Sequence, residues 1–259
     1  MCTLTILPGI KSGSISRGVR IAFNRDEQRS RTSGTNPSLE RHEDWQALLP
    51  RDPQGGGTWI AASDRGLVFT LLNVNPAESD PTSSGGASRG SIIPGLLSSA
   101  SLDEVAARLP ALSAPIRRPF RLVVTDGASL LEAIGGNALV ECLRHPLDQP
   151  FMRCSSGLGD EVVAPLRTEA FSRLFTREGA DPVAAQEAFH RLRFSDREDC
   201  SIDMSREDAL TVSWTLVELR PGVLRMTHHP GPPREQPTPV VLELGLRHPA
   251  PSSTGVVVE

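Results

Sequence analysis

The sequence predicts an α+β fold in which antiparallel sheets are covered by helices. Short apolar runs separated by turns fill the first 75 residues, helical segments follow, and strand-like runs return near residue 200. Strands and helices segregated along the chain are typical of this class, whereas parallel α/β folds alternate them. No repeat is evident in the 259 residues, and we expect residues 1–259 to form a single domain.

The first half of the chain contains two predicted antiparallel strand pairs. Residues Cys2–Leu7 alternate threonine with aliphatic side chains, which is the period-two pattern of a strand. After a turn-rich stretch, Val19–Phe23 is typical of a second strand that pairs back on the first. Two further apolar runs, Thr58–Ala62 and Leu67–Asn73, flank the polar turn "DRG", which predicts a hairpin.

Helices are predicted in the middle of the chain. Ser101 and Glu104 have capping-box spacing, which predicts a helix beginning at Ser101. Helical spacing of apolar residues predicts a helix over 159–175, and another over 182–192 has proline in its first turn. Further apolar runs predict strands over 120–125, 200–204, 211–219, 223–226 and 240–244. By composition, residues 76–91 form a mobile loop and residues 229–259 a proline-rich tail with one strand.

Charge and cysteine content exclude several classes of protein. The formal net charge of -4 favours neither nucleic acid nor an anionic membrane surface as a partner. No apolar run approaches the roughly 18 residues that a membrane-spanning helix needs, and no signal peptide is evident, so we expect a cytoplasmic protein without integral membrane insertion. The four cysteines are widely spaced, which predicts neither a metal site nor disulfides. Cys142, Cys154 and Cys200 lie in or beside apolar strands and are expected to be buried core residues. We expect no cofactor.

Cys2 is the first candidate for chemistry. Removal of Met1, which aminopeptidases carry out when the next side chain is small, would leave a thiol and an α-amino group on one residue. An α-amino group titrates near about 7.7 to 8.0, so a fraction is free base at neutral pH and can accept the thiol proton. Threonine nucleophiles activated by their own terminal amine follow the same logic.

Polar residues at two strand ends are the other candidates. The tetrapeptide "NRDE", Asn24 to Glu27, follows the second strand and would emerge near Cys2 if the first two strands pair antiparallel. Arg25 could then hold the thiolate or a substrate carboxylate, and Asp26 could orient the α-ammonium. Asn73 ends a later strand and offers the amide donor that an oxyanion hole requires. Asn75 is the second candidate for this amide donor.

Together these segments resemble a known family. The pieces "MCT", "NRDE", "GGGTWIAASDRGLVFTLLNVNP" and "SSGLGD" are similar to the NRDE family, also called the transport and Golgi organisation 2 family. The resemblance is dense over residues 2–75 and returns around residues 153–171 and the segment "CSIDMSREDALTVSWTLVEL". It implies a four-layer αββα sandwich of the N-terminal nucleophile (Ntn) hydrolase type, with two antiparallel sheets between helical layers.

The resemblance also implies an activity and a set of site residues. Choloylglycine and penicillin V hydrolases, which the family resembles, use a processed N-terminal cysteine to cleave linear amides. By that likeness Cys2 is the nucleophile of an amidohydrolase that cleaves a C–N or related acyl bond of a small molecule. The same likeness assigns Arg25, Asp26 and Asn73 to catalysis and leaves open whether Asp26 or Glu27 is the acidic partner. Asn24, Glu27 and Ser156 are expected to support the site.

Two departures from the family pattern and one alternative accompany this hypothesis. Ser156 stands where relatives often carry a second amide donor. The arginine usual in a late "TRSST" segment is absent, unless Arg197 takes its place. The alternative is a non-catalytic protein that handles haem or lipid in trafficking, in which His228, His229 or Cys2 touches the ligand.

Overall fold

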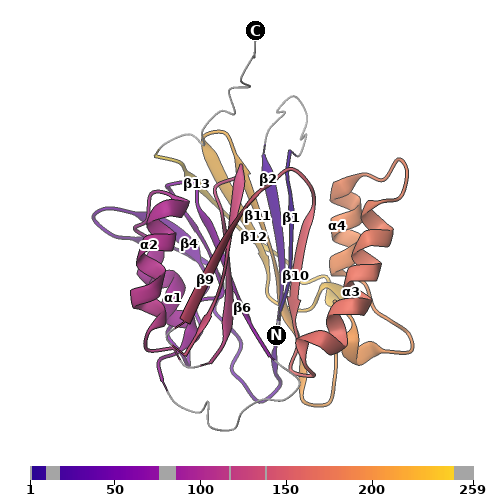
Figure 1. Cartoon of the computed structure of the whole chain (residues 1–259). Helices are drawn as coiled ribbons and strands as arrows, with labels where there is room; N and C mark the ends of the chain where they lie inside the picture. Colours follow the sequence, from indigo (N-terminus) through magenta and orange to yellow (C-terminus); the bar gives the residue numbers. More distant parts are fainter. Residues whose placement is uncertain (1, 10–17, 76–85, 117, 138, 248–259) are drawn as a thin grey trace.

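Two antiparallel sheets pack face to face and carry helices on their outer faces in the computed structural model (Figure 1). The structure describes residues 2–9, 18–75, 86–116, 118–137 and 139–247. Each strand pairing within the described ranges is antiparallel. The predicted αββα sandwich is confirmed.

The first sheet has six strands and contains both ends of the described chain. The N-terminal strand β1 lies between β10 and β2, and β11 pairs with the other side of β2. In spatial order the strands are β10 (Phe151–Ser155), β1 (Cys2–Leu7), β2 (Val19–Gln28), β11 (Ala209–Arg220), β12 (Val223–His229) and β13 (Val240–Gly245). Because β1 is inside the sheet, its backbone is held on both sides.

The second sheet has seven strands in the order in which they occur along the chain. They are β3 (Ser38–Arg41), β4 (Gln46–Leu49), β5 (Ile60–Ser63), β6 (Val68–Asn73), β7 (Phe120–Thr125), β8 (Ser129–Gly136) and β9 (Leu139–Pro146). The predicted turn between β5 and β6 is present, with Gly66 in the left-handed region at φ 78°. Strand β6 faces β1 across the inter-sheet core.

One pair of helices covers each sheet (Figure 1). Helices α1 (Ile92–Leu96) and α2 (Leu102–Ser113) lie on the seven-stranded sheet, and α3 (Asp160–Phe175) and α4 (Pro182–His190) lie on the six-stranded sheet. Short 3-10 turns occur at η2 (Arg89–Ser91), η3 (Glu198–Cys200) and η4 (Pro233–Glu235). The predicted start of α2 is confirmed, since the Ser101 side chain accepts a hydrogen bond from the backbone of Glu104.

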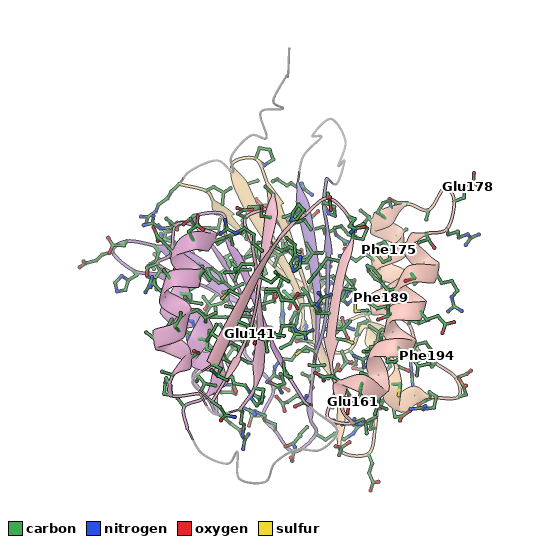
Figure 2. All side chains as sticks on the ribbon, viewed as in Figure 1. Glu141, Glu161, Phe175, Glu178, Phe189 and Phe194 are labelled. Carbon is green, nitrogen blue, oxygen red and sulfur yellow. The ribbon has the colours of Figure 1, made fainter. Side chains whose placement is uncertain are left out.

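Apolar side chains fill the space between the sheets and beneath α1 and α2. The inter-sheet core includes Leu4, Phe23 and Trp59, and a second cluster joins α1 and α2 to the outer face of the seven-stranded sheet. Under α3 and α4 the ring of Phe189 is directed inward and meets Phe171 edge-on at 5.6 Å, whereas Glu178 points outward at the end of this layer (Figure 2).

Several sequence predictions need correction. Residues 200–204 do not form a strand, because the carbonyl groups of Cys200, Ser201 and Ile202 accept hydrogen bonds from side chains instead of from a neighbouring strand. The strand predicted over Val19–Phe23 continues through "NRDE" to Gln28.

The structure also bears on the predictions for the cysteines, for the loop 76–91 and for the tail 229–259. Cys142 is exposed on β9 rather than buried, while Cys154 and Cys200 are buried. Part of the predicted loop 76–91 and part of the tail 229–259, namely 76–85 and 248–259, lie outside the described residues, and residues 89–91 form η2. Among the described residues, no helix combines the length and apolar character needed to cross a membrane.

Candidate active site

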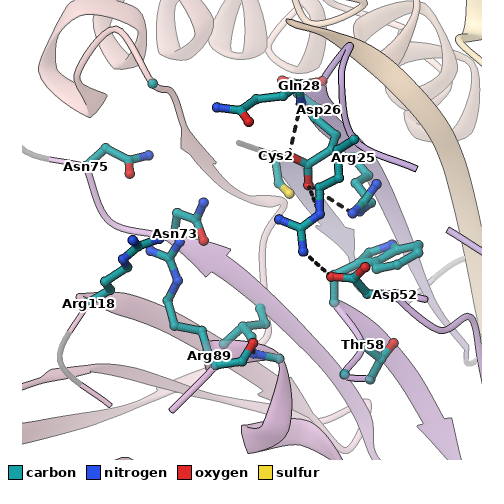
Figure 3. Close-up of a pocket in the computed structure, with 18 of the residues that line it drawn as sticks. Cys2, Arg25, Asp26, Gln28, Asp52, Thr58, Asn73, Asn75, Arg89 and Arg118 are labelled. Atoms are coloured by element: carbon teal, nitrogen blue, oxygen red, sulfur yellow. Dashed lines mark hydrogen bonds and ion pairs between the residues drawn. The ribbon is translucent and has the colours of Figure 1, made fainter. Parts of the chain in front are cut away.

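Cys2 and Asn73 line one pocket of about 630 Å³ from opposite sheets (Figure 3). Cys2 begins β1 and Asn73 ends β6, so the pocket lies where the N-terminal strand meets the other sheet. The described lining residues are mostly polar: Cys2, Arg25, Asp26, Glu27, Gln28, Arg31, Asp52, Gly57, Thr58, Trp59, Leu71, Asn73, Asn75, Gly86, Ala87, Ser88, Arg89, Gly90, Arg118 and Gly157. The pocket thus contains a potential nucleophile together with several amide and guanidinium donors.

Arg25 lies directly beside Cys2 because of the strand register. The two residues are partners in the β1–β2 pairing, so their side chains share the inner face of the sheet. The Arg25 guanidinium stacks over Trp59 at 4.3 Å and its Nη2 donates to Glu27 Oε2 at 2.9 Å. Its Nη1 is buried without a hydrogen-bond partner among the described residues. Arg25 therefore has a donor that a ligand or a thiolate could use.

The thiol of Cys2 is held in an environment that opposes its ionisation. Burial raises the pKa of this thiol, and the Asp26 carboxylate adds to the rise, while the charge of Arg25 and a hydrogen bond from the backbone N–H of Asp26 lower it. The resting thiol is therefore protonated at neutral pH, and a nucleophilic reaction would need a base to remove the proton.

The backbone nitrogen of Cys2 is bound by Ser155 rather than by the neighbouring serine. It donates to Ser155 Oγ at 3.1 Å, across the β1–β10 pairing. Ser156 lies between β10 and α3, where its backbone N–H donates to Asp160 Oδ1 at 2.8 Å and its hydroxyl accepts from the Leu158 N–H. Ser155 is a residue that sequence reasoning missed, because the end of β10 was not recognised.

The two acidic residues of "NRDE" face different surroundings. Asp26 is turned toward α3, and Arg167 Nη2 of that helix lies 4.0 Å from its Oδ2. Thr211 Oγ1 of β11 donates to Asp26 Oδ1 at 2.7 Å. Burial raises the pKa of Asp26, and Arg167 opposes the rise. Glu27 instead pairs with Arg25 on the pocket side. A register shift in β11 between Thr211 and Ser213 lies opposite this stretch of β2.

Asn24 is a structural residue of the helix-facing side of the sheet. Its Nδ2 donates to the carbonyl groups of His190 and Ile202 at 2.9 and 3.0 Å, and its Oδ1 lies 2.9 Å from His190 Nδ1. Because Oδ1 is an acceptor, the ring of His190 carries a proton on Nδ1, and Nε2 accepts from Thr5 Oγ1 at 2.7 Å. Burial lowers the pKa of His190 to about 3, so the ring is neutral.

An arginine that sequence reasoning missed lies beside Asp26. Arg167 of α3 is fully buried and donates to Thr3 Oγ1 at 2.7 Å, to the Ser201 carbonyl at 2.7 Å and to the Cys200 carbonyl at 3.0 Å. Arg197, the residue considered as a replacement for the missing family arginine, pairs with Asp199 at an exposed position. The available signal was the buried stripe of α3, in which Arg167 follows Val163 at the spacing of one helical turn.

Asn73 and Asn75 both reach the pocket from the end of β6 (Figure 3). The backbone of Asn75 is tied to the start of α3, since its carbonyl accepts from Asp160 N–H at 2.8 Å and its own N–H donates to Asp160 Oδ2 at 3.2 Å. Its side-chain Nδ2 is buried without a hydrogen-bond partner among the described residues. Two amides are therefore available on the wall opposite Cys2.

The histidines of the alternative hypothesis lie away from this pocket lining. His228 is buried and its Nδ1 lies 2.8 Å from Thr215 Oγ1, and burial lowers its pKa to about 4. His229 stacks on Trp214 at 4.7 Å. In the described ranges, no group of three or more histidine, cysteine, aspartate or glutamate side chains is arranged to hold a metal ion.

Comparison with protein families identifies part of the chain. The family model described as "Transport and Golgi organisation 2" matches residues 18–143, a range that includes "NRDE", the "GGGTW" block and Asn73. No curated protein matches the chain. The resemblance to this family is confirmed.

Solved structures share the fold at low sequence identity. Penicillin V acylase from Agrobacterium tumefaciens matches with a TM-score of 0.51 and 13% identity over 93% of this chain and 86% of that one. An N-acylethanolamine-hydrolyzing acid amidase ortholog from Caenorhabditis elegans matches with a TM-score of 0.53 and 10% identity over 83% of this chain and 92% of that one. A variant of conjugated bile acid hydrolase from Clostridium perfringens matches with a TM-score of 0.52 and 11% identity over 99% of this chain and 100% of that one. These are Ntn hydrolases, and at such identities the likeness concerns the fold.

Proposed function

We propose that the protein is an N-terminal cysteine hydrolase that cleaves an amide or related acyl bond of a small molecule. The observation that carries this proposal is the shared pocket, in which Cys2 lies beside Arg25 and opposite Asn73. The names of three structures with the same fold supply the reaction class, since each describes an acylase, amidase or hydrolase. We expect the protein to work in the cytoplasm.

Removal of Met1 is the first requirement of the mechanism. The Cys2 nitrogen then becomes an α-amine, which Ser155 Oγ can orient through the contact that it already makes with this atom. Because the pKa of the buried thiol is raised, the α-amine is the base that takes its proton during attack. Arg25 and the Asp26 N–H stabilise the developing thiolate, and the Asp26 carboxylate balances the ammonium that results.

The bond changes follow from these positions. The Cys2 sulfur forms a bond to the carbonyl carbon, and the oxyanion accepts a hydrogen bond from Asn73. The C–N bond breaks as the α-ammonium returns its proton to the leaving nitrogen. Water, deprotonated by the same amine, then attacks the thioester carbon. The C–S bond breaks and the ammonium returns its proton to the sulfur, so that the thiol is regenerated and the products are an amine and a carboxylic acid.

Haem handling is the weaker hypothesis for this pocket. No histidine is among its described lining residues, and His228 is already bound to Thr215. A titration of the purified protein with haem, followed by the Soret band, gives this alternative its own test. A saturable shift that Cys2→Ala abolishes would favour ligand handling over hydrolysis.

The decisive experiment separates the thiol from the amine. Three proteins are compared on a panel of acyl amides and esters: wild type, Cys2→Ala and a variant with one alanine inserted between Met1 and Cys2. We expect at least about a 10³-fold loss of kcat/KM in Cys2→Ala, since truncating the nucleophile removes the covalent route. The insertion keeps the thiol but moves the α-amine to another residue, so we expect a comparable loss.

Two results would contradict the proposal. Intact mass spectrometry that finds Met1 retained in an active preparation excludes the α-amine of Cys2 as the base. Equal turnover by wild type and Cys2→Ala excludes the thiol as the nucleophile.

A further inference from the structure

Two arginines face Cys2 from the far wall of the pocket. Arg89 of η2 and Arg118, which lies just before β7, both line the pocket on the side of Asn73 and Asn75 (Figure 3). They are close enough to repel, since burial first and the charge of Arg118 second lower the pKa of Arg89 to about 10. With a pKa of about 10, Arg89 remains charged at neutral pH.

The other arginines of the pocket are neutralised by acids, whereas this pair is not. Arg25 pairs with Glu27 at 2.9 Å, and Arg31 pairs with Asp52 and also lies 3.8 Å from Glu27. Among the described residues, neither Arg89 nor Arg118 forms an ion pair with an aspartate or glutamate. Counted over the described residues alone, the wall around Asn73 therefore carries two positive charges without a paired acid.

Arg89 is held in place by the backbone. Its Nη1 donates to the Pro119 carbonyl at 3.0 Å, and the N–H of Thr58 donates to the carbonyl of Gly90 at 3.1 Å. Gly57 lies so close to Gly90 that a Cβ at position 57 would come within 2.4 Å of the Gly90 backbone. Gly57, the last glycine of the "GGG" segment, thus allows η2, and with it Arg89, to pack against the pocket rim.

These observations identify a subsite for a negative charge. We propose that Arg89 and Arg118, with the unpartnered amide of Asn75, bind a carboxylate, sulfonate or phosphate group of the substrate while Cys2 attacks its acyl carbon. The attack by Cys2 in this statement rests on the proposed hydrolase function, whereas the binding of the anion does not. Guanidinium groups suit oxyanions because their planar donors bind two oxygens at once, and such charge-assisted hydrogen bonds are stronger than neutral ones.

Matched substrates that differ by one charge test the subsite. N-hexanoylglycine and N-hexanoylglycinamide place the charge on the amine side of the scissile bond. Glutaryl-p-nitroanilide and its terminal carboxamide place it on the acyl side. In one of the two pairs, we expect wild type to prefer the anionic member by about tenfold or more in kcat/KM. Arg89→Gln and Arg118→Gln should each remove most of that preference.

The same assay includes a control variant and an outcome that would contradict the subsite. Arg225→Gln removes an equal charge from an exposed position on β12, where Arg225 contacts Glu243, and should leave the preference unchanged. Equal kcat/KM for the charged and neutral members of both pairs would overturn the subsite while leaving the hydrolase proposal intact.

Binding without turnover separates the two proposals. Cys2→Ala is titrated by calorimetry with the same four compounds, and the double variants Cys2→Ala/Arg89→Gln and Cys2→Ala/Arg118→Gln are titrated in parallel. If wild type hydrolyses none of the compounds, binding of an anionic member at least tenfold tighter than its neutral partner, lost in the double variants, supports the subsite alone. Equal affinity within both pairs, or no binding of any compound, overturns it.

Discussion

The helical layers on the two sides of the sandwich bury different kinds of side chain. Beneath α1 and α2 lies an apolar layer that includes Phe69, Ile93, Leu96, Val105, Leu109 and Leu122. Beneath α3 and α4 lies a polar layer whose fully buried members include Thr3, Thr5, Asn24, Arg167, Gln186 and His190. Both layers are closed to solvent, yet only the second touches the strands that carry Cys2 and Arg25.

The two layers stabilise the fold by different physical means. Burial of apolar surface is non-directional, so the apolar layer can be repacked with little change in the position of any strand. The polar layer is directional: Gln186 Nε2 donates to Thr5 Oγ1 at 2.9 Å, and Arg20 Nη1 donates to Gln186 Oε1 at 2.8 Å. A one-residue slip of β1 would leave such buried groups unpaired. We infer that the polar layer fixes the register that brings Cys2 beside Arg25.

Replacing Arg167 should have the largest effect on both stability and activity. Arg167→Met keeps the volume but removes the buried positive charge 4.0 Å from Asp26 and the donor to the carbonyls of Cys200 and Ser201. Breaking a buried ion pair in this way costs about 3–5 kcal/mol of unfolding free energy, measured by denaturant titration. Since Asp26 and Thr3 lose their support, we also expect kcat/KM to fall on the order of tenfold to a hundredfold.

The matching change in the apolar layer is Leu109→Ala. Its fully buried side chain packs beneath α2, and its truncation should cost about 2–5 kcal/mol of unfolding free energy. In the fraction that remains folded, we expect wild-type kcat/KM. Equal loss of activity in Leu109→Ala and Arg167→Met at equal stability would remove the distinction between the layers.

Much of the sandwich could be predicted from local patterns. The alternation in Cys2–Leu7 and the apolar run before "NRDE" predicted two paired strands, and antiparallel pairing alone brought Arg25 near Cys2. The sequence pattern could not show which of the two neighbouring side chains, Arg25 or Asp26, faces the pocket. Successive side chains of a strand point to opposite faces, so Arg25 and Asp26 cannot both reach the pocket by their side chains.

The polar layer was harder to predict than the strands. Arginine is a good helix former and usually lies at the surface, so the residue type of Arg167 argued against burial and only its spacing from Val163 in α3 indicated it. Its partners are the carbonyls of a segment more than 30 residues away, which the sequence pattern assigned to a strand. Ser155 was missed for a related reason, since its contact with the Cys2 nitrogen depends on the pairing of β10 with β1.

A second test of the polar layer uses its buried histidine. The pKa of His190 is depressed to about 3 in the folded state, so the unfolded chain, with a pKa near 6.5, takes up the proton first. The stability that neutral His190 provides is therefore fully present above about pH 6.5 and is lost as the pH falls toward 3. Between pH 7 and 4.5 this amounts to about 2–3 kcal/mol.

His190→Gln provides the comparison, with urea titrations at several pH values as the measurement. The unfolding free energy of the variant should fall less steeply as the pH is lowered. Part of the pH dependence should remain, because the pKa of His228 is also lowered in the folded state. Parallel curves for wild type and His190→Gln would mean that the ring is not held neutral by the polar layer.

The smallest expected effect concerns the N-terminus of α2, at the edge of the apolar layer. Ser101 Oγ accepts from the Glu104 N–H at 3.2 Å, and Glu104 Oε2 accepts from the Ala100 N–H at 2.8 Å. Ser101→Ala leaves helix donors without a partner and should cost about 1 kcal/mol, seen as a lower denaturation midpoint. Ser101→Asp, which keeps an accepting oxygen, should stay near wild type. Because the hydrogen bonds of the cap join only residues 100, 101 and 104, neither variant should change kcat/KM. A loss of activity here would show that the apolar layer also positions the site.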